Sequence, residues 1–189
     1  MALPPSSIFP SISIIWPSFM CISFPSFLCT MPLGITLVPS DMVIAWSKDL
    51  GRSLDYLETR PEIDRQRLAF YGMSLGAIDG VVLVALEDRF QTAVLLSGGF
   101  RFIRVPPEIE PINFAPRVRI PTLLLGGRQD LAHPLETAQK PFFQLLGTPE
   151  KDNKHVIFEG GHAPLKIQSL IKDILDWLDR YLGPVKMRG

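Results

Sequence analysis

The sequence predicts an α/β fold built on a parallel, doubly wound sheet. Short apolar runs of strand length alternate along the chain with longer stretches whose apolar residues recur at helical spacing. Strands that alternate with helices pair in parallel, because each intervening helix returns the chain across the sheet. With 189 residues, of which 47% are hydrophobic, the chain is long enough to bury the core of one domain.

The first elements are expected after residue 40. Asp41 can cap a helix that ends before Pro61, and a strand at residues 68–71 follows. The next helix, over residues 75–86, is apolar nearly all round, which predicts that it is buried against the sheet. The first of these helices carries the apolar stripe Val43, Trp46, Leu50, Leu54 and Leu57.

The second half of the chain repeats the alternation. Strands are expected at residues 92–97, 122–126 and 155–158, with a helix over about 134–146 between the last two. Residues 100–118 form a proline-containing connection that we expect to line or cover the edge of the sheet. About four strands therefore belong to the predicted sheet.

The last helix is the clearest element. Gly183 and Pro184 end it. Its apolar residues keep i, i+3 and i+4 spacing: Ile167, Leu170, Ile171, Ile174, Leu175, Leu178 and Leu182.

A G-x-S-x-G pentapeptide, Gly72-Met73-Ser74-Leu75-Gly76, lies between the strand at 68–71 and the helix that follows it. A serine on such a turn has a strained backbone and an exposed hydroxyl that can attack a carbonyl carbon. The flanking glycines let neighbouring backbone approach closely, because they have no Cβ atom. The motif is typical of a nucleophile elbow, although an ordinary glycine-rich turn between a strand and a helix can have the same sequence.

A nucleophilic serine requires a base and an orienting carboxylate, and both follow in the order Ser, Asp, His. Asp130 follows the strand at 122–126, and His162 follows the strand at 155–158. Loops after the strands of an open parallel sheet gather at one edge, where ligands bind. We therefore expect Ser74, Asp130 and His162 to lie together. Glu159 is an alternative acid, but it would have to fold back onto His162 within one tight turn.

The other two histidines are expected to have no catalytic role. His133, in the loop after Asp130, is expected to face solvent, as loop histidines ordinarily do. His155 lies at the start of a strand, which is the wrong end of the sheet for catalysis. Arg128 and Gln129 flank Asp130 and are expected to shape its loop.

The chain from about residue 41 to 185 resembles the C-terminal half of an α/β-hydrolase. More narrowly it is similar to the dienelactone hydrolase and prolyl-oligopeptidase-like esterase branch. The segments that carry the resemblance are residues 54–64, 72–76, 120–130 and 158–162.

The resemblance implies a role for four residues. Ser74 would be the nucleophile, Asp130 the orienting acid and His162 the general base. The backbone N–H of Leu75 would be one of two oxyanion donors, since the residue after the nucleophile supplies one. The substrate class implied is a small acyl compound, with no cofactor and no metal.

The resemblance also implies that part of the fold is missing. Members of the superfamily place about four strands, a helix and the second oxyanion-donor loop ahead of the elbow, which takes about 100 residues or more. Only 73 residues precede Ser74. Residues 1–40 are apolar and rich in proline and serine, and they contain no Asp, Glu, Lys or Arg. We therefore expect residues 1–40 to be a non-domain segment and residues 41–189 to be a partial α/β-hydrolase domain.

The missing half should leave the strand at 68–71 without a neighbour. Only residues 11–15 or 33–38 could take the place of the missing neighbouring strand. An exposed apolar sheet edge favours self-association with a second copy of the chain.

Charge and cysteine content exclude several other functions. The 19 basic and 19 acidic residues form no long run, so nothing indicates a nucleic acid partner. Cys21 and Cys29 have neither the spacing nor the neighbouring histidine of a metal site. Prolines interrupt the apolar runs of the first 40 residues, so neither a secretory signal nor a membrane span is clearly present, and we expect a cytoplasmic protein.

Two functions remain. The first is a serine hydrolase of esters or related acyl substrates that acts through a Ser-His-Asp triad. The second is a catalytically inactive fragment of the hydrolase fold, or an interaction domain that has kept the site.

Overall fold

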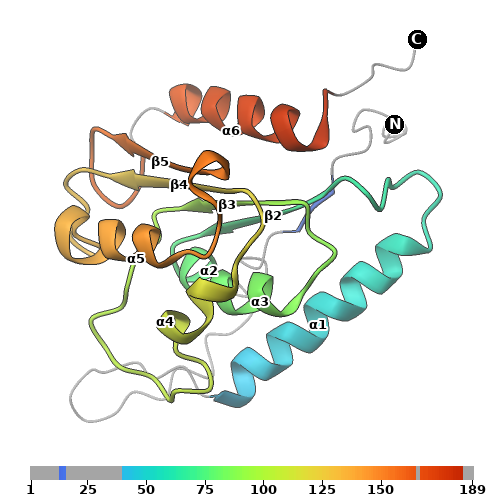
Figure 1. Ribbon diagram of the computed structural model, residues 1–189, viewed down its shortest axis with the longest axis horizontal. Helices are drawn as coiled ribbons and strands as arrows, with labels where there is room; N and C mark the ends of the chain where they lie inside the picture. Colours follow the sequence, from blue (N-terminus) through green and yellow to red (C-terminus); the bar gives the residue numbers. More distant parts are fainter. Residues whose placement is uncertain (1–12, 16–39, 165–166, 185–189) are drawn as a thin grey trace, which may run out of the picture.

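The computed structural model describes residues 13–15, 40–164 and 167–184. Five parallel strands form one sheet in the order β1-β2-β3-β4-β5 (Figure 1). They are β1 (Ser13–Ile15), β2 (Leu68–Met73), β3 (Thr92–Leu96), β4 (Thr122–Gly127) and β5 (Asn153–Phe158). The predicted fold class is confirmed. Cys21, Cys29 and most of the segment 1–40 lie outside the described residues.

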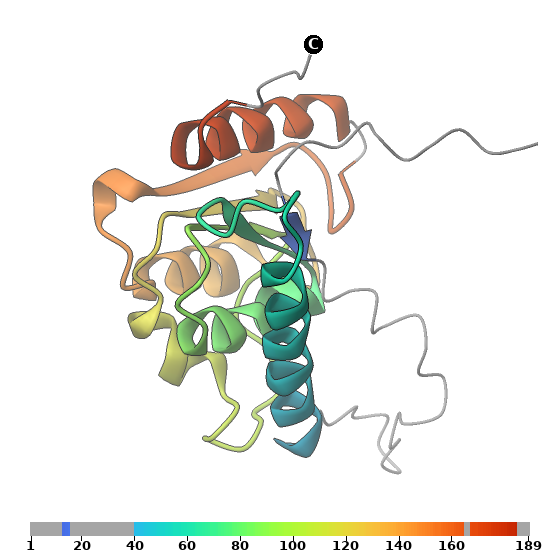
Figure 2. The same ribbon diagram turned by 90° about the vertical axis from the view of Figure 1, so that its right-hand side faces the viewer.

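Helices cover both faces of the sheet. The described helices are α1 (Ser40–Glu58), α2 (Leu75–Ile78), α3 (Gly80–Leu86), α4 (Pro111–Phe114), α5 (Lys140–Leu145) and α6 (Ile167–Leu182). α6 lies alone above the sheet, and the other helices lie below it (Figures 1 and 2). Among the described residues no helix combines the length and the hydropathy needed to cross a membrane.

Alternation along the strands explains the two layers. Leu95 of β3 and Leu124 of β4 point to the lower core, whereas Leu96 and Leu125, one residue later, pack with α6. Successive side chains of a strand point to opposite faces, so a strand buried on both faces must be apolar throughout. All residues of β3 and β4 are indeed buried.

The predicted helix over 75–86 is two short helices, α2 and α3, which meet at Asp79. The side chain of Asp79 is 3% exposed and forms an ion pair with Arg101, from the connection after β3. A buried carboxylate is tolerated only when it is paired, so this ion pair fixes the connection to the helix that follows Ser74. The predicted helix over 134–146 likewise begins as a π-helical turn at Leu135–Gln139 before α5.

The apolar residues of α6 do not all face the sheet. Leu170 and Leu178 are buried, but Ile171 and Leu175 are 45% and 51% exposed. Trp177 is buried in the interface and donates a hydrogen bond from Nε1 to Thr92 Oγ1 at 2.8 Å. An indole fills more of the interface than a leucine, so the helix turns its tryptophan toward the sheet.

The prediction that β2 lacks a neighbour was also wrong. Ser13, Ile14 and Ile15 pair in parallel with Leu68, Ala69 and Phe70. Three residues between prolines are enough for a short strand at the sheet's edge, where proline is tolerated. Self-association through this edge remains a prediction.

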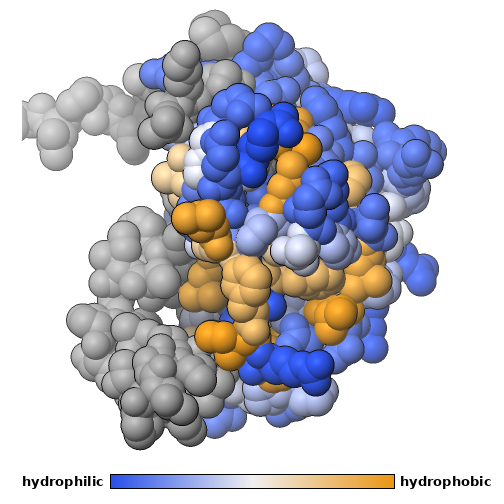
Figure 3. Space-filling model, turned by 90° about the vertical axis from the view of Figure 1, so that its left-hand side faces the viewer, coloured by the Kyte–Doolittle hydropathy of each residue, from blue (hydrophilic) through white to orange (hydrophobic). Residues whose placement is uncertain are grey.

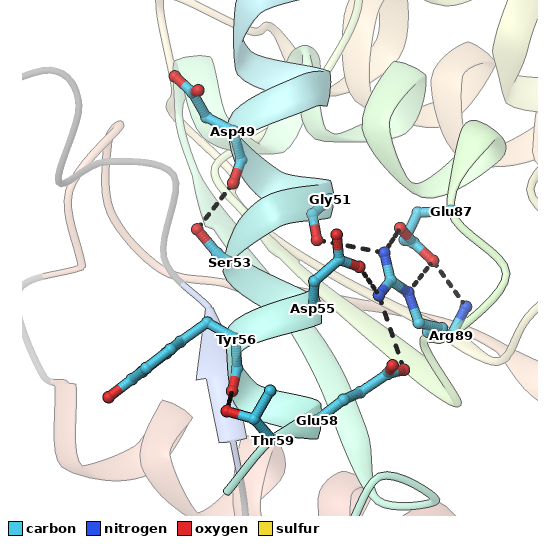
Figure 4. A network of polar contacts seen from close by, with 9 residues as sticks. All are labelled: Asp49, Gly51, Ser53, Asp55, Tyr56, Glu58, Thr59, Glu87 and Arg89. Carbon is cyan, nitrogen blue, oxygen red and sulfur yellow. Dashed lines mark hydrogen bonds and ion pairs between the residues drawn. The ribbon is translucent and has the colours of Figure 1, made fainter.

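Arg89 joins α1 to the loop between α3 and β3 (Figure 4). Its guanidinium lies 2.7 Å from carboxylate oxygens of both Glu87 and Asp55, and 3.6 Å from Glu58. It also donates to the carbonyl oxygen of Gly51 at 3.3 Å. Hydrogen bonding of the Arg89 guanidinium to the Glu87 carboxylate is the main cause of a raised pKa for Arg89. The long first helix is therefore held to the rest of the molecule by one charged residue as well as by its apolar stripe.

Candidate active site

Three side chains of complementary chemistry meet where three strands end. Ser74 directly follows β2, whereas Asp130 and His162 lie in the loops after β4 and β5. The strands are parallel, so these loops gather at the same edge of the sheet. The strands end toward the left of Figure 1.

The backbone of Ser74 is strained in the way that the pentapeptide predicts. Its φ of 53° and ψ of −115° lie outside the ordinary regions for a non-glycine residue. Its N–H donates to the carbonyl oxygen of Leu96 at 2.8 Å, which fixes the turn to β3. A Cβ atom on Gly72 would lie 2.2 Å from the carbonyl oxygen of Gly76, so the turn requires glycine there. Strain of this kind persists only when the surroundings impose it, and it is characteristic of functional sites.

The three side chains form a continuous hydrogen-bonded chain. His162 Nε2 lies 2.7 Å from Ser74 Oγ, and His162 Nδ1 lies 2.9 Å from Asp130 Oδ2. The side chain of Asp130 is fully buried, and that of His162 is 34% exposed. The structure thus brings together the three residues that the sequence had singled out, and the imidazole lies between the hydroxyl and the carboxylate.

The second oxygen of Asp130 is held by its own loop. Asp130 Oδ1 accepts hydrogen bonds from the N–H groups of Ala132 at 2.8 Å and His133 at 3.0 Å. Two backbone donors compensate the buried carboxylate for the water it has lost. The carboxylate therefore has one oxygen fixed by backbone and the other directed at His162.

The loops that carry Asp130 and His162 are joined to each other. Gln129 N–H donates to the carbonyl oxygen of Gly160 at 2.9 Å, and Gly160 N–H donates to Gln129 Oε1 at 3.1 Å. A Cβ atom on Gly127 would lie 2.1 Å from the carbonyl oxygen of Gly161, so the two loops approach at a distance that only glycine permits. These contacts agree with the predicted role of Gln129 in shaping the loop.

Ser97 also contacts the candidate site, a role that was not predicted from the sequence. This residue follows β3 with a φ of 54°, and its Oγ donates to the carbonyl oxygen of His162 at 2.6 Å. The hydrogen bond fixes the backbone of His162 from the neighbouring strand. A serine followed by two glycines at a strand end was the available signal.

His133 is buried, so the prediction that it faces solvent was wrong. Its ring lies 5.6 Å from that of His162, and its Nδ1 lies 3.3 Å from the carbonyl oxygen of Phe100. Burial lowers the pKa of His133. The loop folds back because His133 N–H is one of the donors to Asp130, and that bond carries the ring inward.

Glu159 and His155 lie away from the three joined side chains. Glu159 is exposed and accepts a hydrogen bond from Arg128 Nε at 2.6 Å, so Asp130 is the carboxylate that contacts His162. His155 lies beside Gln139, with its Nε2 3.3 Å from Gln139 Oε1.

Leu75 is the first residue of α2. N–H groups in the first turn of a helix have no acceptor within the helix. Leu75 therefore lies at the position, directly after Ser74, where the N–H of an oxyanion donor is expected. Within the described part of the chain no cluster of three or more His, Cys, Asp or Glu side chains could hold a metal ion.

Comparison with known proteins identifies the fold. No family model and no curated protein matches the sequence. Among solved structures, a cold-adapted esterase from an Arctic intertidal metagenomic library is 24% identical with a TM-score of 0.59, covering 76% of this chain and 60% of its own. Acetyl xylan esterase from Paenibacillus sp. R4 is 20% identical with a TM-score of 0.60, covering 72% of this chain and 52% of its own.

The acylaminoacyl peptidase of Pyrococcus horikoshii is 18% identical with a TM-score of 0.61, and the match covers 76% of this chain and 29% of the peptidase. These proteins are α/β-hydrolases. The chain therefore has the α/β-hydrolase fold, and it spans about 60% of the length of the Arctic esterase.

Proposed function

We propose that the protein is a serine hydrolase of esters or related acyl compounds. The observation that carries the proposal is the pair of distances at His162: 2.7 Å to Ser74 Oγ on one side and 2.9 Å to Asp130 Oδ2 on the other. These are hydrogen-bond distances, and they link a nucleophile, a base and an orienting acid in the arrangement that acyl transfer requires.

Each residue has one role in the proposed mechanism. His162 Nε2 accepts the proton of Ser74 as Oγ attacks the substrate carbonyl carbon, and the imidazolium then protonates the leaving alcohol. Water attacks the resulting acyl-enzyme while His162 acts again as base, which releases the acid and restores Ser74. Asp130 stays ionised: it accepts a hydrogen bond from the Nδ1–H of His162, fixes the tautomer and stabilises the imidazolium.

The tetrahedral oxyanion is stabilised by the N–H of Leu75. In the wider fold the first donor comes from the residue after the nucleophile. Loss of one oxyanion donor typically lowers kcat by about 10²–10³-fold. The N–H of Leu75 is therefore expected to have a large effect on how fast the chain turns over its substrate.

Labelling of the 189-residue chain by a fluorophosphonate probe tests the proposal directly. We expect the probe to modify Ser74, as shown by peptide mapping, and Ser74→Ala to abolish the labelling. Ser53→Ala is the matched control, because Ser53 is exposed on α1 and only donates to the carbonyl oxygen of Asp49. An unlabelled Ser74 in folded protein would support the alternative of an inactive fragment or interaction domain.

A further inference from the structure

A cavity of about 470 Å³ is lined by the connection between β3 and α4 and by residues of α4 itself. This connection descends on the left of Figure 1, the side toward which the strands end. Seen from that side, hydrophobic side chains form a broken band among hydrophilic ones (Figure 3). The volume lies within the range of small-molecule binding sites.

The walls of the cavity are attached to the elements that carry the candidate triad. Phe100 lines the cavity, and its carbonyl oxygen lies 3.3 Å from Nδ1 of His133, whose ring is 5.6 Å from that of His162. Arg101 also lines the cavity and is bound to Asp79, at the end of the helix that begins after Ser74. The connection is thus fixed both to the nucleophile's helix and to the loop beside the base.

The lining is mainly apolar. Phe100, Ile103, Val105, Pro107 and Ile112 all contribute to it. Phe100 is held in turn by an edge-to-face contact with Phe142 of α5, with ring centroids 5.5 Å apart. Ile103 and Ile112 line the cavity and are 41% and 47% exposed, so apolar surface of the cavity wall is in contact with solvent. Exposed apolar side chains around a cavity are typical of a binding site for an apolar group.

The charges around the cavity balance. Arg101 and Arg104 line it together with Glu110, and Asp79 neutralises Arg101 from behind. Burial lowers the pKa of Arg101, and the negative charge of Glu110 opposes this effect. Asp79 pairs with Arg101 from outside the cavity, and Glu110 lines the cavity together with Arg104, so the four charges cancel and an uncharged apolar group fits the cavity better than an anion does.

We propose that this cavity binds an uncharged, medium-length apolar group of the ester substrate, and that Ile103 and Ile112 determine the preference for it. The inference rests on the proposed hydrolase function. The ion pair between Asp79 and Arg101 holds the cavity wall to the end of the helix that begins after Ser74.

The test compares 4-nitrophenyl hexanoate with 4-nitrophenyl acetate on the full chain. Ile112→Trp fills the cavity, so we expect kcat/KM for the hexanoate to fall at least about tenfold and that for the acetate to change less than about twofold. Ile103→Trp should act in the same direction if Ile112→Trp fails to fold. Ile171→Trp is the matched control, because Ile171 is also an isoleucine about half exposed, but on α6.

A binding measurement separates this inference from the proposed function. In the Ser74→Ala background we expect hexanamide, followed by ligand-observed NMR, to bind at least about fivefold more weakly after Ile112→Trp than after Ile171→Trp. If hexanamide shows this difference in binding but the chain hydrolyses no ester, the inferred role of the cavity is supported and the proposed hydrolase function is rejected. Equal effects of Ile112→Trp and Ile171→Trp on binding, or equal losses for acetate and hexanoate, would overturn the cavity inference.

Discussion

His162 Nε2 lies 2.7 Å from Ser74 Oγ although 88 positions separate the two residues in the chain. The contact needs β2 and β5 to end at the same edge of the sheet, and it needs the loops after β4 and β5 to be joined. Hydrogen bonds between Gln129 and Gly160 supply that join. The candidate site is therefore a product of parallel pairing together with a small number of loop contacts.

Asp130→Asn should lower kcat for a 4-nitrophenyl ester by about 10³–10⁴-fold with little change in stability, because an amide of the same shape favours the wrong tautomer of His162. The measurement is steady-state kinetics with thermal unfolding as a check on the fold. Glu159→Gln is the control, since Glu159 is exposed and contacts Arg128. Comparable losses in the two variants would argue against Asp130 as the orienting acid.

Asp79→Ala should lower the free energy of unfolding by about 3–5 kcal/mol, because Arg101 would stay buried without its partner. Urea unfolding measures the change. The double variant Asp79→Ala/Arg101→Met should recover part of the loss, since neither charge is then left alone. Glu136→Ala removes the exposed partner of Lys140 and should cost less than about 1 kcal/mol. If Asp79→Ala lowers the free energy of unfolding no more than Glu136→Ala does, the buried ion pair does not stabilise the fold.

Acidification should destabilise the protein through His155. Burial, with a smaller effect from the charge of Lys140, lowers the pKa of His155 from 6.5 to about 4 in the folded state. Below pH 6.5 the unfolded chain therefore binds a proton that the folded protein does not bind until about pH 4, so stability falls as pH falls through this window.

The urea midpoint at pH 7 and at pH 4.5 measures this effect. His155→Gln cannot titrate and keeps a donor for Gln139, so the drop between the two pH values should be smaller than in the unmodified chain. An equal drop in both proteins would exclude His155 as a source of the pH dependence.

Arg89→Ala should lower the free energy of unfolding by about 1–3 kcal/mol, because the side chain is only 28% exposed and binds carboxylates on both sides of the α1 contact. Arg52→Ala, which removes an exposed contact of 3.7 Å to Asp49, should change stability by less than about 0.5 kcal/mol. The midpoints of chemical denaturation of the Arg89→Ala and Arg52→Ala variants measure the difference. Indistinguishable midpoints would mean that the apolar stripe alone holds α1.

Sequence patterns were sufficient for the elements and for the three joined side chains. Continuous apolar runs of strand length located β2 to β5, and apolar residues at a period of 3.6 located the long helices, because burial of a strand on both faces or of a helix on one face imposes those patterns locally. The pentapeptide pointed to Ser74 because the strained turn at this serine leaves no room for a Cβ atom at position 72, so glycine is required there. Asp130 and His162 followed from chain order and from their positions after strands.

Other features depend on contacts between distant segments, which no local pattern encodes. Asp79 interrupts a helix because Arg101 arrives from another loop, and the hydroxyl of Ser97 reaches His162 only once β3 and β5 belong to the same sheet. His133 is buried because the loop of Asp130 folds back, and Ser13–Ile15 becomes a strand because β2 offers an edge. Local sequence patterns were therefore enough to predict the fold class and the three joined residues, whereas contacts between distant segments set which polar groups are buried, paired and held beside those residues.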